Sequence, residues 1–173
     1  MDDRVVLRPA TAADVDRVYA WANDPLTRAV SFSSAEITYS EHVAWFTQQL
    51  ERSDRNLLIA MSTEHPAAAI ATIRIDRAAQ PGVCIISINL APEARGRGLG
   101  TAALEAATAS AAALGFSRIH ALIRPDNQAS IRAFTRAGYV QAESTEVGDQ
   151  PALLFVRQRG PSQGNLSPPR GAT

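Results

Sequence analysis

Cysteine and long apolar runs are scarce in this sequence. The single cysteine, Cys84, has no partner for an internal disulfide and lies within an apolar stretch, so we expect it to be a small buried side chain. No apolar run approaches the roughly 20 residues that span a bilayer. The opening residues, Met1-Asp2-Asp3-Arg4, are acidic and unlike a signal peptide. We therefore expect a cytoplasmic protein with no membrane partner.

Net charge and clustered metal ligands are also lacking. The 17 basic and 17 acidic residues cancel, which argues against a nucleic-acid or anionic-membrane partner, because both usually need a net basic face. The histidines have no ligand spacing, so no metal site is predicted. His65 is expected at the surface and His120, in a predicted strand, in the core.

Length and composition indicate one domain followed by a tail. The 173 residues suffice for a single core. We expect the domain to span residues 1–157. Residues 158–173 are rich in glycine and proline with almost no apolar side chains, which predicts a disordered tail.

Hydrophobic periodicity and turn residues predict the order β-α-α-β-β-β-α-β-α-β-β. Strands are expected at residues 5–7, 56–61, 67–75, 83–90, 118–123, 139–147 and 152–157. Thr11 is expected to cap a first helix that ends before Pro25. Ser40 is expected to cap a second, with Val43, Phe46 and Leu50 facing inward. Further helices are expected over residues 99–114 and from Asp126 or Asn127 to residue 138.

The most informative stretch is Arg95-Gly96-Arg97-Gly98-Leu99-Gly100, which joins a predicted strand to an alanine-rich helix. Free amides at the helix start and the helix dipole make such a turn an anion site. Gly98 and Gly100 leave room for a diphosphate, and the arginines add positive charge. The spacing matches neither the dinucleotide fingerprint nor the phosphate loop of nucleotide hydrolases.

A second motif follows at residues 127–139, Asn-Gln-Ala-Ser-Ile-Arg-Ala-Phe-Thr-Arg-Ala-Gly-Tyr. The two together resemble motifs A and B of the GCN5-related N-acetyltransferase (GNAT) superfamily, over residues 5–157. The resemblance implies an α/β (α+β) fold, a mixed sheet of about seven strands with four helices. It also implies acetyl-CoA as cofactor, with its pantetheine arm between splayed fourth and fifth strands.

By this resemblance, backbone groups of the fourth strand hold the pantetheine arm, amides of the glycine turn hold the diphosphate, and the last helix contributes further contacts. Arg136 is an alternative to Arg132 for the nucleotide phosphates. The predicted cofactor-binding residues are Leu90, Ala91, Arg95, Gly96, Arg97, Gly98, Leu99, Gly100, Thr101, Asn127, Ser130 and Arg132.

The sequence departs from the superfamily at its usual acid and base. The start of the fourth strand has no glutamate, and Phe134 replaces the tyrosine that often protonates the thiolate; Tyr139 fills a packing position. Proximity alone can supply about 7–11 kcal/mol, so catalysis need not be lost. Strand alternation puts Ser87 and Asn89 on one face. They either line the site or bond to neighbouring backbone.

An early segment, Trp21-Ala22-Asn23-Asp24-Pro25 with Arg28 and later Glu41-His42, is similar to acetyltransferases of nucleotide-linked amino sugars (pseudaminic-acid-type). The resemblance implies that Asn23, Asp24 and Arg28 bind the acceptor.

His42 is the candidate base because imidazole titrates near neutrality, and Glu41 is the alternative. Plainer roles remain open for these residues: an Asx turn at Asp24, a surface charge at Arg28 and a solvated imidazole at His42.

The leading interpretation is an acetyl-CoA-dependent N-acetyltransferase of a small-molecule amine, with a nucleotide-linked amino sugar favoured. One alternative is a ribosomal-protein-type N-terminal peptide acetyltransferase. Another is a non-catalytic acyl-CoA-binding module. Either a monomer or a homodimer is compatible with the sequence.

Overall fold

A computed structural model describes residues 4–64 and 68–158 as a seven-stranded sheet in the order β1-β2-β3-β4-β5-β7-β6. Neighbouring strands are antiparallel except β4 and β5, which are parallel. The strands are β1 Val5–Pro9, β2 Arg55–Ser62, β3 Ala69–Arg77, β4 Val83–Leu90, β5 Arg118–Ile123, β6 Val140–Val147 and β7 Gln150–Gln158.

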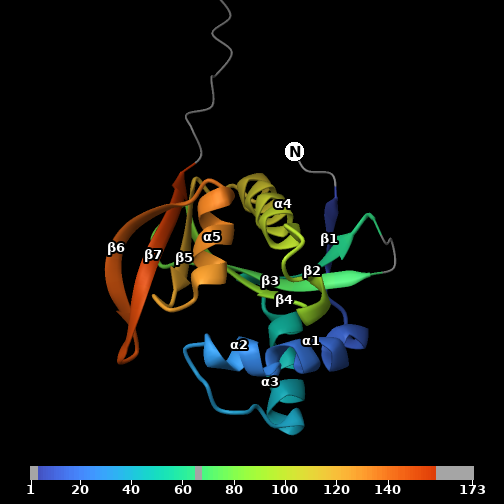
Figure 1. Ribbon diagram of the computed structural model, residues 1–173. Helices are drawn as coiled ribbons and strands as arrows, with labels where there is room; N and C mark the ends of the chain where they lie inside the picture. The colour runs from blue at the N-terminus through green and yellow to red at the C-terminus, as the bar shows by residue number, and fades with distance from the viewer. Residues whose placement is uncertain (1–3, 65–67, 159–173) are drawn as a thin grey trace, which may run out of the picture.

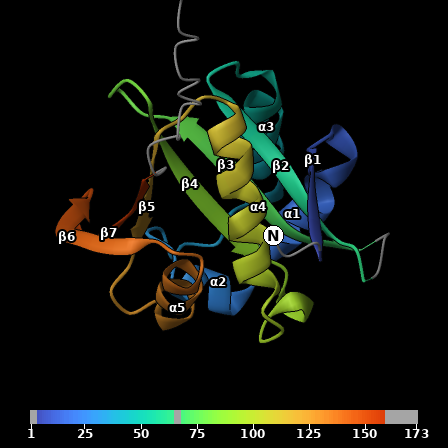
Figure 2. The ribbon, with the colours of Figure 1, turned by 90° about the horizontal axis from the view of Figure 1, so that it is seen from above.

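Helices cover both faces of the sheet. Figure 1 shows α4 and α5 over one face and α1, α2 and α3 over the other, and from above α4 crosses β3 and β4 (Figure 2). The described α-helices are α1 Val15–Ala22, α2 Pro25–Ala29, α3 Tyr39–Glu51, α4 Leu99–Ala113 and α5 Gln128–Arg136; the 3-10 turns are η1 Ala12–Asp14 and η2 Pro92–Ala94. Within residues 4–64 and 68–158, no helix has the length and apolar character needed to cross a bilayer.

The core lies between α4 and the central strands. Small side chains of α4, such as Ala103 and Ala107, are fully buried, which lets the helix approach the sheet closely. They pack in one cluster with Ile73 and Ile86 of β3 and β4. Cys84 is fully buried, as expected, and burial raises the pKa of its thiol to about 11.

The mixed sheet confirms the expected fold class, but the helical part needs three corrections. A fifth α-helix, α2, was not expected; it forms because Asp24 caps it and accepts from the Thr27 amide at 3.0 Å. The cap of α3 is Thr38, in a capping box with Glu41, rather than Ser40. Leu50 does not face the core, being 36% exposed.

The described chain reaches the end of β7 at Gln158, one residue beyond the expected domain boundary. The rest of the predicted tail, residues 159–173, lies outside the described residues, as does His65.

Candidate functional site

The parallel strands β4 and β5 part after a short paired region. Their register runs only from Val83 opposite Arg118 to Ile85 opposite His120, although β4 continues to Leu90 and β5 to Ile123. Backbone groups on the facing edges beyond His120 therefore have no strand partner there. An extended molecule with amides of its own could satisfy them. We call this opening the fork.

At the mouth of the fork, the glycine turn presents backbone amides. Gly98 is the N-cap of α4 in the left-handed conformation, with φ of +77°, and Gly96 has φ of +74°. The amides of Gly96, Arg97 and Gly98 make no hydrogen bond within the described chain, and those of Leu99 and Gly100 have no intrahelical acceptor because they open α4. A Cβ built on Gly96 meets no heavy atom within 4 Å. This open, amide-lined turn fits a diphosphate.

The arginines of the turn have protein partners. Arg95 Nη2 donates to Asp24 Oδ2 at 2.7 Å and to Thr27 Oγ1 at 2.9 Å, so the guanidinium is directed toward α2 rather than toward the predicted phosphates. Arg97 donates to Glu64 Oε2 at 3.2 Å. Sequence reasoning missed Arg4, whose Nη2 lies 3.7 Å from the Cβ position of Gly98.

Helix α5 follows β5 in the chain, just as the glycine turn follows β4. Asn127 is its N-cap, and the side-chain Oδ1 of Asn127 accepts from the Ser130 backbone amide at 3.1 Å. This oxygen therefore has a structural role in capping the helix. Arg132 and Arg136 are exposed and have no ion pair among the described residues, which leaves both able to meet an anion. Leu90 and Thr101 are half-buried, whereas Ala91 is fully buried, so Ala91 can contribute only backbone groups.

The aromatic residues of the second motif are core residues. Phe134 and Tyr139 are each 2% exposed and pack edge to face. The Tyr139 hydroxyl is 2.8 Å from Thr108 Oγ1 of α4, and burial raises the pKa of Tyr139 to about 12. Neither side chain reaches the fork as a proton donor.

The predicted acceptor-binding residues hold loops together. Asn23 donates to Ile37 O at 2.8 Å and accepts from Ile37 N at 2.9 Å, which clamps the segment 30–38. Arg28 donates to Ser33 O at 2.9 Å and to Ser31 Oγ at 3.2 Å. These bonds engage both terminal nitrogens of the guanidinium, so Arg28 is not the free surface charge that a phosphate contact would need.

The same segment is fastened to the other side of the fork. Arg124, just after β5, donates to Ser31 O at 3.0 Å. Gln150, at the start of β7, donates to Phe32 O at 2.7 Å. Segment 30–38 therefore borders the fork, held between α2, β5 and the β6–β7 hairpin.

The two candidate bases of the sequence analysis do not lie in an open site. His42 is 2% exposed among Tyr19, Trp45 and Phe46, and its Nε2 is 3.1 Å from Val15 O. Burial lowers the pKa of His42, and its side chain is almost wholly covered by the protein. Glu41 accepts from Thr38 Oγ1 at 2.6 Å, and this bond lowers the pKa of its carboxyl. His42 is thus a buried ring rather than the solvated imidazole of the plainer interpretation, and Glu41 serves the capping box of α3.

Ser87 and Asn89 lie on the open half of β4, both partly exposed. Their recorded partners are side chains, not the neighbouring backbone: Arg74 donates to Ser87 Oγ at 3.3 Å, and Thr27 Oγ1 is 3.3 Å from Asn89 Oδ1. The structure therefore brings Asn89 together with Asp24, Thr27 and Arg95 and leaves His42 and Glu41 apart from them.

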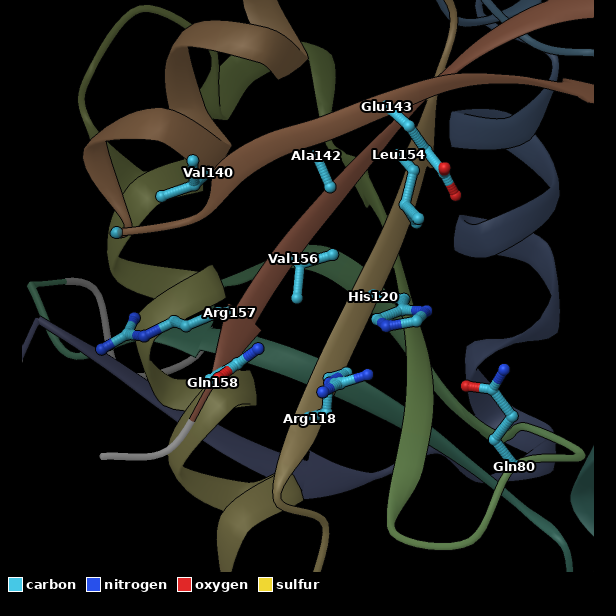
Figure 3. Close-up of a pocket in the computed structure, with 11 residues that line it drawn as sticks. Gln80, Arg118, His120, Val140, Ala142, Glu143, Leu154, Val156, Arg157 and Gln158 are labelled. Atoms are coloured by element: carbon cyan, nitrogen blue, oxygen red, sulfur yellow. The ribbon is translucent and has the colours of Figure 1, made fainter. Parts of the chain in front are cut away.

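A groove that the sequence analysis did not anticipate lies on the open face of β5, β7 and β6 (Figure 3). Its volume of about 700 Å³ is in the range of small-molecule sites. His120 is half-buried in its wall rather than in the core, which corrects the expectation for this residue. The other principal lining residues are Gln80, Arg118, Glu143, Leu154 and Val156. No cluster of three or more metal-ligating side chains occurs in the part of the chain that the structure describes.

Comparison with known proteins bears on both fold and family. Residues 4–140 match the family described as acetyltransferase (GNAT) domain. Aminoglycoside acetyltransferase AAC(6')-Ib in complex with coenzyme A and kanamycin is similar, with a TM-score of 0.78, 22% identity, and coverage of 90% of this chain and 95% of that chain. A structure of the same enzyme with paromomycin and acetyl-CoA has a TM-score of 0.79 at 23% identity, and the match covers 91% of this chain and 94% of that chain.

A spermidine N-acetyltransferase from Vibrio cholerae, in complex with CoA and spermine, has a TM-score of 0.78 at 12% identity and covers 91% of this chain and 96% of that chain. At these identities the likeness shows the fold. Among curated proteins, none matches the sequence. The named neighbours act on aminoglycosides and a polyamine, so they do not bear out the specific resemblance to enzymes of nucleotide-linked sugars.

Proposed function

This chain belongs to the GNAT acetyltransferase domain family, and we propose that it transfers an acetyl group from acetyl-CoA to an amine of a small cationic molecule that carries an amino sugar. The observation that carries the proposal is the fork between β4 and β5, which opens at one end onto five free amides of the glycine turn. Structural neighbours crystallised with CoA or acetyl-CoA support the choice of donor.

The residues of the donor half suit coenzyme A. The amides of residues 96–100 would hold the diphosphate, and the free edge of β4 near Leu90 would pair with the pantetheine amides. Bound acetyl-CoA supplies an activated acyl group with a thiolate as leaving group. Arg132 and Arg136 would meet the nucleotide phosphates.

Exposed carboxylates support a cationic acceptor. Glu36 lies in segment 30–38, Glu143 in β6 and Asp149 in the β6–β7 turn, and none has an ion-pair partner among the described residues. Negative charge on segment 30–38 and on the β6–β7 hairpin attracts a polycation and repels a phosphate. Because Arg28 is engaged by its own loop, it is not free to bind the phosphates of a nucleotide-linked sugar.

Catalysis would rest first on orientation. The cluster of Asp24, Thr27, Asn89 and Arg95 fixes the acceptor-side helix α2 against the open half of β4. The Arg95 guanidinium lowers the pKa of Asp24, so this carboxylate stays ionised and acts as an anchor rather than an acid. Holding both reactants at the fork supplies the proximity term, about 7–11 kcal/mol at most.

Acetyl transfer can be tested with the purified chain and a panel of acceptors. The panel contains kanamycin, spermidine, a nucleotide-linked amino sugar and a basic peptide, and CoA release is followed with a thiol reagent. The protein itself gives little background, because Cys84 is buried and the sequence contains no lysine to act as an acceptor. Turnover of the aminoglycoside above the other acceptors is expected; acetylation of the peptide alone, or of none, would contradict the proposal.

A further inference from the structure

His120 lies where the fork begins. It is opposite Ile85, the last paired residue of β4, and its ring lines the groove over β5, β7 and β6 (Figure 3). We propose that His120 is the catalytic residue that accepts the proton of the amine, and that the groove admits the acceptor to it. The inference rests on the proposed acetyltransferase function and names a residue that takes part in it.

The length of the fork supports this placement. From Leu90 at the mouth to Ile85 at the base, β4 rises about 16 Å. Between the thiol sulfur and the nearest phosphorus of CoA there are about thirteen bonds, equivalent to about four residues of extended chain. With the diphosphate on the glycine turn, the acyl carbon would lie near residues 85–87 of β4, at the level of His120.

The surroundings of His120 favour a neutral ring. Burial lowers the pKa of His120, Arg118 on the same strand acts in the same direction, and Glu143 on β6 opposes them. The facing residues of β4 and β7, Ile85 and Val156, carry no charge. No hydrogen bond to another described residue occupies the ring nitrogens, so the ring keeps an acceptor nitrogen for the substrate.

The step balances as an acyl transfer. The amine lone pair forms the bond from nitrogen to the acyl carbon, and one proton of that nitrogen passes to the imidazole. The bond from carbon to sulfur breaks with its electron pair on sulfur. The imidazolium then releases its proton to solvent through the open groove, or to the departing sulfur.

The test uses the whole chain with His120→Gln, which keeps a polar side chain of similar reach but cannot take the proton. A general base contributes about 100-fold to 10,000-fold, so we expect a fall of that size in kcat. The affinity for acetyl-CoA, measured by calorimetry, should be unchanged, and the acidic limb of the kcat/KM profile should disappear. Gln48→Ala, at an exposed position of α3 that does not line the groove, is the control and should behave as wild type.

A second readout needs only the wild-type protein. The pKa of the His120 ring, followed by NMR, should lie below the ordinary 6.5 and coincide with the acidic limb. A separation of more than one pH unit overturns the assignment, as does a His120→Gln enzyme within threefold of wild-type kcat. Failure of the wild type to acetylate any acceptor overturns the proposed function instead, so the two failures are distinguishable.

Discussion

The proposed donor half and the proposed acceptor half of the fork are built from different parts of the chain. The donor half is backbone: the free edge of β4 and the amides of a turn whose glycines adopt positive φ. The acceptor half is made of side-chain ties between distant segments, such as Asp24 with Arg95 and Asn23 with Ile37. A site made of backbone groups depends on the backbone conformation. A site held by side-chain hydrogen bonds depends on both side chains of each bonded pair being present.

This difference explains why sequence motifs predict the donor half better than the acceptor half. Glycines in a turn have one main reason to be there, because few other residues adopt that conformation. A polar side chain such as Arg28 or Glu41 can serve a ligand or its own loop with equal chemistry. In this structure both serve the loop or the helix end.

The donor half should be the more sensitive to one substitution. Gly98→Val places a branched side chain at φ of +77° in the middle of the amide cradle, and the left-handed conformation alone costs about 1–2 kcal/mol. Distortion of the cradle adds to this, so we expect at least about a 100-fold loss of acetyl-CoA affinity by calorimetry. Gly115→Val, with φ of +90° after α4, is the matched control for strain. Unchanged affinity in a folded Gly98→Val protein would remove the turn from the donor site.

The tie between the halves should give the next largest effect. Asp24→Asn removes the charge partner of Arg95 and weakens the cap of α2. The Kd for acetyl-CoA and the KM for the amine should therefore both rise, and the product of the two increases should be about 30-fold. Asp54→Asn breaks the exposed pair with Arg52 and serves as control, because exposed ion pairs contribute little. If only one of the two constants changes, Asp24 does not couple the halves.

Loosening the acceptor half alone should have a smaller effect. Arg28→Ala frees segment 30–38 at Ser31 and Ser33, so we expect the amine KM to rise about tenfold with kcat little changed. The rise should be equal for acceptors with and without a phosphate, and acetyl-CoA affinity should be unaffected. A rise confined to the nucleotide-linked sugar would instead make Arg28 a phosphate ligand.

Much of the fold was predictable because its signals are local. Strands 83–90 and 118–123 have the predicted limits, since each is an apolar, β-branched run bounded by turn residues. The five-residue helix α2 is too short to show a period, so it was missed.

The acceptor half was not predictable in the same way. Asp24 and Arg95 are 71 positions apart, and the sequence near either residue does not predict their contact. His120 belongs to no motif; its position at the fork follows only from the parallel register with Ile85. Sequence reasoning therefore assigned it to the core.

The smallest effect on activity should come from Tyr139, the tyrosine that follows Phe134 in the second motif. Phe134 itself occupies the position of the usual acid. Tyr139→Phe removes a hydroxyl that is buried against Thr108, which should cost about 1 kcal/mol of stability for the lost hydrogen bond. Because this hydroxyl does not reach the fork, kcat should stay within about threefold, far less than the 100-fold expected of a general acid. Thermal unfolding and steady-state kinetics on the same preparation separate the two quantities. A large fall in kcat with unchanged stability would assign Tyr139 to the protonation of the thiolate and extend the donor half into the core beneath α4.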